Sequence, residues 1–296
     1  MSEEEKKCAG NCSSCGHKCE DDGDRKMRLA LSKIKRQIVV MSGKGGVVKS
    51  TVSANLAMGL SMEGYKVGLL DVDFHGPSIP KMVNMESEQP LSDGEMIEPI
   101  TAGTLKVMSL GMLLETPDSP VIWRGPMKIA VVKQLLGEVN WGELDFLVID
   151  CPPGTGDEPL SVCQNLLESG EAVIVTTPQQ VAASDVAKSL NFCNQLGFPV
   201  SGIVENMSTF ICPKCGEVHS IFSTGAGEEL AAKYNVPFLG KLPLDPAVWV
   251  KRKRWKASTA KICMHDGRRC CPPPLSSCST WDSSRKKLCW MPWTSC

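Results

Sequence analysis

The segment that most constrains the fold is a glycine-rich loop at residues 43–51, which reads GKGGVVKST. An apolar, β-branched run at residues 37–42 precedes it, and residues 50–63 carry apolar side chains at helical spacing. A buried strand, a glycine-rich loop and a helix in this order are typical of a phosphate-binding loop. Backbone N–H groups and the helix N-terminus of such a loop meet the phosphates. The alternative, an ordinary glycine-rich turn, would not explain why Lys-Ser-Thr opens the helix.

Each residue type in the loop predicts a contact. Lys49 is expected to reach the terminal phosphates, and the Ser50 hydroxyl to ligate Mg²⁺. The standard motif has glycine at position 48, where this chain has Val48, so we expect nucleotide to bind weakly and to be hydrolysed slowly. The predicted nucleotide contacts are Gly43, Lys44, Gly45, Gly46, Val47, Val48, Lys49, Ser50 and Thr51.

Aspartate side chains lie at the C-terminal ends of two predicted strands. Asp71 and Asp73 lie at the end of a strand at residues 66–71, and Asp150 ends the apolar run at residues 144–150. Carboxylates at strand ends beside a phosphate loop hold Mg²⁺ through water or position the attacking water. A single such Asp is often only a helix cap or turn residue. Two groups in the expected order favour the functional interpretation.

Strands and helices alternate along the central part of the chain. Further strands are expected at residues 171–177, 200–206 and 236–239, helices at 126–139, 181–196 and 225–234, and an irregular excursion with short strands at 84–104. This alternation predicts a doubly wound α/β fold, with a mainly parallel sheet covered by helices on both faces. We expect a cysteine-rich flexible arm at residues 1–34, a nucleotide-binding domain at 35–247 and an atypical, disordered basic tail at 248–296.

Composition limits the location and the chemistry. No run approaches the length of about 18 apolar residues that a membrane helix needs, and no apolar segment follows the N-terminus as in a secretory signal. We therefore expect a cytoplasmic protein. The chain has 15 cysteines, which in a reducing compartment indicate metal or redox work rather than a disulfide framework.

The predicted tail differs in charge from the rest. Residues 249–296 hold eleven Lys/Arg and two Asp/Glu, although the net charge of the whole chain is −1. One interpretation is a basic arm for nucleic acid or a membrane surface. The other is a disordered or frame-shifted terminus, which we favour because the basic residues form no helical face.

Two groups of cysteines could bind metal. Cys212 and Cys215 form a C-x-x-C motif, whose thiolates can reach one metal but cannot fill a four-ligand site. The spacing leaves a bridged iron–sulfur cluster, a zinc site completed by His219 and another residue, and a redox dithiol all open. The second group, Cys8, Cys12, Cys15 and Cys19, could wrap one tetrahedral metal or one cubane, or consist of unligated thiols.

Six ordered blocks resemble the Mrp/ApbC group of iron–sulfur carrier ATPases. They read GKGGVVKST, DVDFHGPSIP, WRGPM, WGELDFLVIDCPPGTGDEPLS, VENM and CPKCG, and the resemblance covers about residues 35–247. These carriers are related to MinD and ParA in the SIMIBI class of P-loop proteins. The resemblance implies an ATP-hydrolysing homodimer that carries a [4Fe–4S] cluster to recipient apo iron–sulfur proteins.

The resemblance also implies roles for single residues. Lys44 corresponds to the signature lysine of the deviant Walker A motif, which reaches across the dimer to the partner's nucleotide. Asp73 acts on the water or on Mg²⁺, Asp150 is the Walker B carboxylate, and Asn206 contacts adenine. Cys212 and Cys215 share a bridging [4Fe–4S] cluster with the partner. The chain departs from the family at Val48 and beyond residue 246.

The sequence is also compatible with two other functions. A MinD/ParA-like positioning ATPase would act on membrane or DNA, and only the basic tail supports it, so a nucleic-acid partner is not expected. A zinc-stabilised regulatory nucleotide-binding protein would have lost hydrolysis through Val48. The C-x-x-C motif favours the carrier, because positioning does not need it.

Overall fold

The computed structural model describes residues 22–74, 76–113, 123–220 and 225–244. The four N-terminal cysteines and residues 248–296 lie outside these ranges. Within them, no helix has the length and apolar character that crossing a membrane requires.

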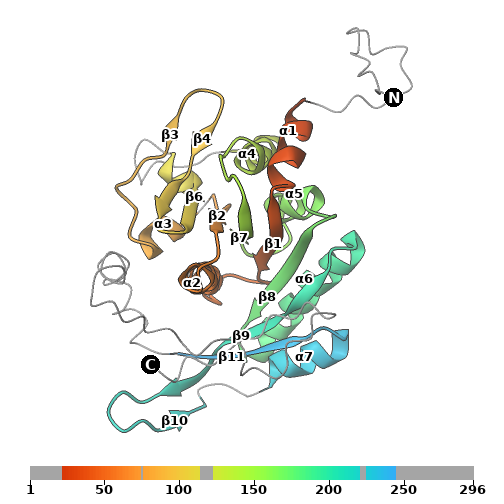
Figure 1. Cartoon of the computed structure of the whole chain (residues 1–296). Helices are drawn as coiled ribbons and strands as arrows, with labels where there is room; N and C mark the ends of the chain where they lie inside the picture. Colours follow the sequence, from red (N-terminus) through yellow and green to blue (C-terminus); the bar gives the residue numbers. More distant parts are fainter. Residues whose placement is uncertain (1–21, 75, 114–122, 221–224, 245–296) are drawn as a thin grey trace, which may run out of the picture.

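A nine-stranded sheet forms the centre of the molecule (Figure 1). Its strands are β1 (Ile34–Met41), β2 (Val67–Asp71), β5 (Ile100–Ala102), β6 (Leu105–Ser109), β7 (Leu144–Asp150), β8 (Gly170–Thr176), β9 (Val200–Ile211), β10 (Val218–His219) and β11 (Phe238–Leu244). The spatial order is β10-β9-β8-β1-β7-β2-β6-β5, with β11 paired to β9. Only β5 and β10 pair antiparallel to their neighbours, on β6 and β9. The strands β3 (Leu91–Ser92) and β4 (Ile97–Glu98) form a separate small sheet.

Helices cover both faces of the large sheet. They are α1 (Asp22–Leu31), α2 (Lys49–Met62), α3 (Ile79–Met82), α4 (Gly125–Gly137), α5 (Asp157–Asn165), α6 (Gln180–Leu196) and α7 (Ala226–Tyr234), with a 3₁₀ turn, η1, at Leu110–Met112. Along β1, Val39 packs with α1, α4 and α5, whereas Ile38 and Val40 pack with α2 and α3. Alternate side chains of a strand point to opposite faces, so β1 contributes to two apolar layers. The predicted doubly wound, mainly parallel fold is confirmed.

Several elements differ from the sequence prediction. Helix α1 lies in the range expected to be a flexible arm, and its Met27 and Leu31 are buried against the core. The polar composition of residues 1–26 concealed this helix, because only two of its side chains provide the packing. Helix α5 and strand β6 were not predicted. Strand β9 continues past the expected end at residue 206 to Ile211.

We predict that α1 stabilises the domain through Met27. The Met27 side chain is 4% exposed, and a Cβ at Gly137 of α4 would lie only 3.0 Å from its Cα and Cβ, so the two helices touch closely. Met27→Ala should lower the free energy of unfolding, measured by urea denaturation, by about 2–3 kcal/mol. The control is Leu29→Ala on the same helix, where a 57% exposed side chain should change it by about 0.5 kcal/mol or less. Equal effects of the two substitutions would mean that α1 does not pack as described.

Candidate functional site

The glycine-rich loop connects β1 to α2 at the middle of the sheet. Its first residue, Gly43, lies against the backbone of α6: a Cβ there would approach the carbonyl carbon of Asp185 to 2.2 Å. Only glycine fits at that distance, so α6 fixes where the loop leaves the strand. Lys49, Ser50 and Thr51 form the first turn of α2, as the motif requires.

Val48 has a left-handed backbone conformation, with φ 60° and ψ 39°, directly before α2. Glycine adopts this region without penalty, whereas a β-branched residue there is strained. The sequence shows only that valine stands where the motif has glycine. The structure adds a backbone reason, since the loop needs a positive φ at the position where its motif usually has glycine.

Lys49 and Asp150 form a buried ion pair. The distance from Lys49 Nζ to Asp150 Oδ1 is 2.5 Å, and the two side chains are 5% and 0% exposed. The Ser53 hydroxyl donates a second hydrogen bond to the same oxygen, at 2.6 Å. Among the described residues, Asp150 Oδ2 is buried without a hydrogen-bond partner. A buried acceptor of this kind indicates a missing donor.

Asp71 lies beside this pair, because β2 and β7 are neighbours and Asp71 is level with Asp150 in the sheet. Its carboxylate accepts hydrogen bonds from the backbone N–H groups of Asp73 and Ile79 and from the Ser109 hydroxyl. Burial, followed by repulsion from Asp150, raises the pKa of Asp71 to about 8. Burial beside Asp150 therefore favours the neutral form of Asp71, and Lys49 pairs with Asp150.

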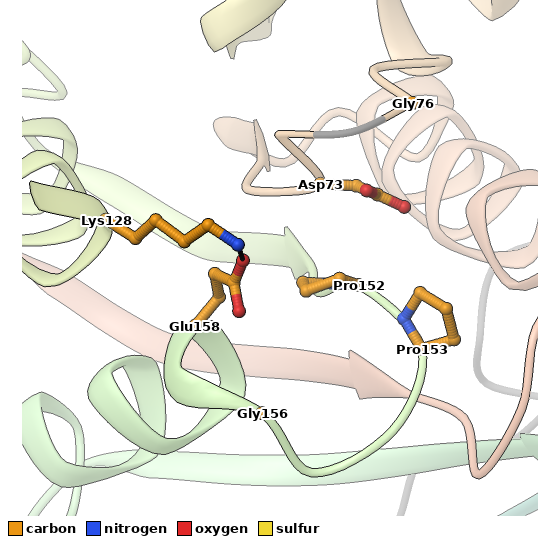
Figure 2. A pocket seen from close by; sticks show the side chains of 7 residues that line it. All are labelled: Asp73, Gly76, Lys128, Pro152, Pro153, Gly156 and Glu158. Atoms are coloured by element: carbon orange, nitrogen blue, oxygen red, sulfur yellow. Dashed lines mark ion pairs between the residues drawn. The ribbon is translucent and has the colours of Figure 1, made fainter. Parts of the chain in front are cut away.

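A cavity of about 440 Å³ opens at the carboxyl ends of β2 and β7 (Figure 2). It is lined by Asp73, Gly76, Lys128, Pro152, Pro153, Gly156 and Glu158. Figure 2 shows the ion pair between Lys128 of α4 and Glu158 of α5, 2.8 Å long, on one side of the cavity and Asp73 on the other. Lys128 and Glu158 were not predicted from the sequence, because neither residue belongs to a phosphate-loop motif and they meet only through the packing of α4 on α5.

The residues present fit a magnesium ion. Hydroxyl and carboxylate oxygens are what Mg²⁺ prefers, and it usually keeps several of its waters. Ser50 and Asp73 would hold it, and the unpartnered Asp150 Oδ2 would accept a hydrogen bond from a bound water. Bound Mg²⁺ would neutralise charge on the phosphates. These assignments remain predictions.

Two further predicted contacts have defined surroundings. Lys44 is partly exposed, and its carbonyl accepts a hydrogen bond from the Ser42 hydroxyl at 3.1 Å. Its role across a dimer stays a prediction. Asn206, expected to contact adenine, is buried in β9, and its Nδ2 donates to the Val47 carbonyl at 3.0 Å. Its side chain therefore holds the phosphate loop, a role that the sequence did not indicate.

Cys212 and Cys215 lie in the turn of the β9–β10 hairpin, at one end of the sheet order. The Cys212 N–H donates to the Glu217 carbonyl, and the Gly216 N–H donates to the Cys212 carbonyl, both at 2.9 Å. Hydrogen bonds from the backbone N–H groups of Cys215 and Lys214 lower the pKa of the Cys212 thiol. Cys215 is exposed and Cys212 partly so.

The hairpin does not complete a metal site by itself. Over the described ranges, no cluster of three or more Cys, His, Asp or Glu side chains is placed to hold a metal ion. His219, considered as a zinc ligand, has its Nε2 3.7 Å from Glu217 Oε2. Cys151, Cys163 and Cys193 are buried in the core, and burial raises their pKa values, so they behave as small apolar residues.

The conformation of Val48 generates a prediction about nucleotide affinity. Val48→Gly should relieve a strain of roughly 1–3 kcal/mol and tighten binding of MgADP, measured by calorimetry, on the order of tenfold. Val48→Ala removes the β-branch but keeps a Cβ at positive φ, and should give an intermediate affinity. If the wild type binds MgADP as tightly as Val48→Gly does, the strain at Val48 does not lower the affinity for nucleotide.

Comparisons with known proteins show which family the chain resembles. A family model described as NUBPL iron-transfer P-loop NTPase matches residues 33–265. The iron-sulfur cluster carrier protein of Methanococcus maripaludis is 49% identical over 247 residues, which cover 80% of this chain and 86% of that protein. The cytosolic Fe-S cluster assembly factor NUBP2 homolog of Dictyostelium discoideum is 51% identical over 229 residues, covering 76% of this chain and 86% of the relative.

A solved structure supports the same relationship. A nucleotide-binding protein from Archaeoglobus fulgidus, in complex with ADP, matches with a TM-score of 0.69 and 42% identity, covering 80% of this chain and 92% of that one. The resemblance to the Mrp/ApbC carriers, first seen in the motifs, is confirmed. By sequence and fold, this chain belongs to the family of NUBPL-type iron-transfer P-loop NTPases.

Proposed function

We propose that this chain is an ATP-hydrolysing carrier that holds a [4Fe–4S] cluster and delivers it to apo iron–sulfur proteins in the cytoplasm. The observation that carries the proposal is an accessible Cys212–Cys215 pair on a hairpin of a nucleotide-binding domain. The names of the relatives, an iron-sulfur cluster carrier protein and a cytosolic Fe-S cluster assembly factor, support it.

The nucleotide site supplies the hydrolytic part. Lys49 moves from Asp150 to the terminal phosphates, and Asp73 orients the attacking water from the rim of the cavity. Phosphoryl transfer needs positioned charges rather than covalent catalysis, so residues of this kind are sufficient. Strain at Val48 keeps turnover slow.

The hairpin of each chain supplies only two thiolates, which favours a cluster shared by a dimer. A cubane takes four thiolates, and Cys212 and Cys215 provide two. A two-fold axis brings the same surface of each subunit together, so two hairpins can complete one site. The lowered pKa of Cys212 favours the thiolate that iron requires, and exposure of the turn lets the cluster leave for a recipient.

We predict one cluster per dimer at this hairpin. The test uses the full-length chain with Cys8, Cys12, Cys15, Cys19 and the six cysteines of residues 249–296 replaced by serine, reconstituted anaerobically with iron and sulfide. It should show the broad visible absorption of a cubane and about four irons per dimer. Cys212→Ser and Cys215→Ser should each abolish both signals.

Cys163→Ala is the matched control, because it removes a buried thiol that cannot reach the hairpin surface, and it should retain the cluster. Retention of iron in both hairpin variants would contradict the proposal. So would stoichiometric zinc in the protein as purified, which is what a zinc-stabilised regulatory protein would contain.

Lys44 provides the test of hydrolysis across the dimer. If Lys44 neutralises the partner's phosphates, Lys44→Ala should lower kcat on the order of a thousandfold without unfolding the domain. Lys35→Ala, which removes an exposed lysine paired with Asp145, is the control and should hydrolyse ATP normally.

Mixing subunits distinguishes action across the dimer from action within one subunit. Lys44→Ala and Asp73→Ala subunits are each expected to be inactive alone. Random pairing makes half of the dimers mixed, each with one intact composite site, so the mixture should recover about a quarter of wild-type activity. No recovery would mean that Lys44 acts within its own subunit.

A further inference from the structure

One hydrogen bond links the phosphate loop to the strand that carries the cysteines. Asn206 Nδ2 on β9 donates to the carbonyl of Val47, a residue 159 positions earlier in the chain, at 3.0 Å. Both side chains are buried. Val47 directly precedes the strained Val48 and the start of α2. A shift of the Val47 carbonyl therefore moves or breaks its hydrogen bond to Asn206.

Strand β9 has an unusual joint immediately after this contact. Met207 has φ 55°, a left-handed value in the interior of a strand. The pairing of β9 with β8 ends one residue before Asn206, at Glu205, and its pairing with β11 shifts register between Leu242 and Leu244. Strained residues of this kind persist only where their surroundings hold them, and they cluster at functional and switching segments.

The strand is anchored on both sides of the joint. Before it, the buried Glu205 Oε2 accepts a hydrogen bond from the Gly227 N–H of α7 at 2.9 Å. After it, the Ser208 hydroxyl donates to the Leu242 carbonyl of β11 at 3.0 Å. Asn206 itself still pairs with Leu242 of β11, and the next pair is Phe210 with Leu244, so the irregular segment where β9 can change direction begins at Met207.

Beyond the joint, β9 runs without interruption to Ile211, and Cys212 follows. At about 3.3 Å per residue, Asn206 and Cys212 are roughly 20 Å apart along one continuous strand. Figure 1 shows β9 extending away from the body of the sheet toward the β10 hairpin. A change of direction at Met207 therefore moves the rest of β9 and the cysteine turn together.

We propose that Asn206 is a positioning residue that couples the phosphate loop to Cys212 through the Met207 joint of β9. The inference rests on the proposed function, since it takes the nucleotide loop and the cysteine turn as the two working sites. Nucleotide phosphates compete with Asp150 for Lys49, and the loop that begins α2 adjusts as Lys49 moves. Asn206 follows the Val47 carbonyl, and β9 beyond the joint carries the change to the hairpin. Such coupling is reciprocal, so ligation of the thiols changes nucleotide affinity by the same factor.

A purely structural role for Asn206 makes a different prediction. If its amide only satisfies a buried carbonyl, its loss lowers stability and weakens nucleotide binding. It would not change how Cys212 responds once nucleotide is bound. The response of the thiol is therefore the measurement that separates the two roles.

The experiment uses the full-length, reduced, metal-free protein under anaerobic conditions. The rate at which N-ethylmaleimide labels Cys212 is measured by peptide mass spectrometry, with and without saturating MgADP. In the wild type, MgADP should change this rate about fivefold or more, the lower end of usual couplings between sites. In Asn206→Ala and in Met207→Gly the change should fall below about twofold, although MgADP, titrated separately for each variant, still saturates the protein.

Asn235→Gly is the matched control for the joint. Asn235, the C-cap of α7, also has a positive φ, at 53°, but it does not lie on β9, so this variant should keep the full response. An unchanged labelling rate in the wild type at saturation overturns the coupling. A full response in Met207→Gly and Asn206→Ala overturns it as well. By contrast, failure of the wild type to bind MgADP, or to hold a cluster, would count against the proposed function and not against the joint.

Discussion

The buried ion pair between Lys49 and Asp150 is the interaction around which the rest of the site is arranged. Two charges removed from water are tolerated only when they are paired and hydrogen-bonded, and removing one partner of such a pair typically costs about 3–5 kcal/mol. Here Ser53 provides the additional hydrogen bond, and burial and repulsion from Asp150 raise the pKa of the neighbouring Asp71, which disfavours a second negative charge there. The pair can form only because β7 lies directly beside β1, which brings the end of one strand next to the loop of the other. A phosphate that binds Lys49 in place of Asp150 therefore alters the charge balance around Asp150 and Asp71.

The shape of the phosphate loop is imposed from outside it. The α6 backbone leaves no room for a side chain at Gly43, and Asn206 holds the carbonyl of Val47. Between these two restraints, Val48 is kept in a conformation that valine disfavours. The surrounding fold thus holds the loop at a positive φ, and this conformation is strained because valine stands where the motif has glycine. Such strain is compatible with the slow hydrolysis that we expect.

The cysteine hairpin provides only part of the metal site that we propose for it. Cys212 and Cys215 are accessible, and backbone N–H groups favour the thiolate of Cys212, but the hairpin brings too few ligands to close a metal site. A site that needs a second subunit can be opened by separating the subunits, which suits the release of a cargo. Strand β9 connects the two proposed sites, because its Asn206 holds the phosphate loop and Cys212 directly follows its last residue, Ile211.

The sequence by itself determined the features that depend on neighbours along the chain. The phosphate loop, the runs ending at Asp71 and Asp150 and the C-x-x-C spacing are local patterns. The loop and the two runs were found in their expected elements, and the predicted alternation of strands and helices gave the mainly parallel sheet. Only the tertiary structure could decide which distant residues meet. The bond from Asn206 to Val47, the pair of Lys128 with Glu158 and the packing of α1 through Met27 have no local signature. They arise because the order of strands in the sheet and the packing of its helices place residues side by side whose separation in sequence carries no information about their contact.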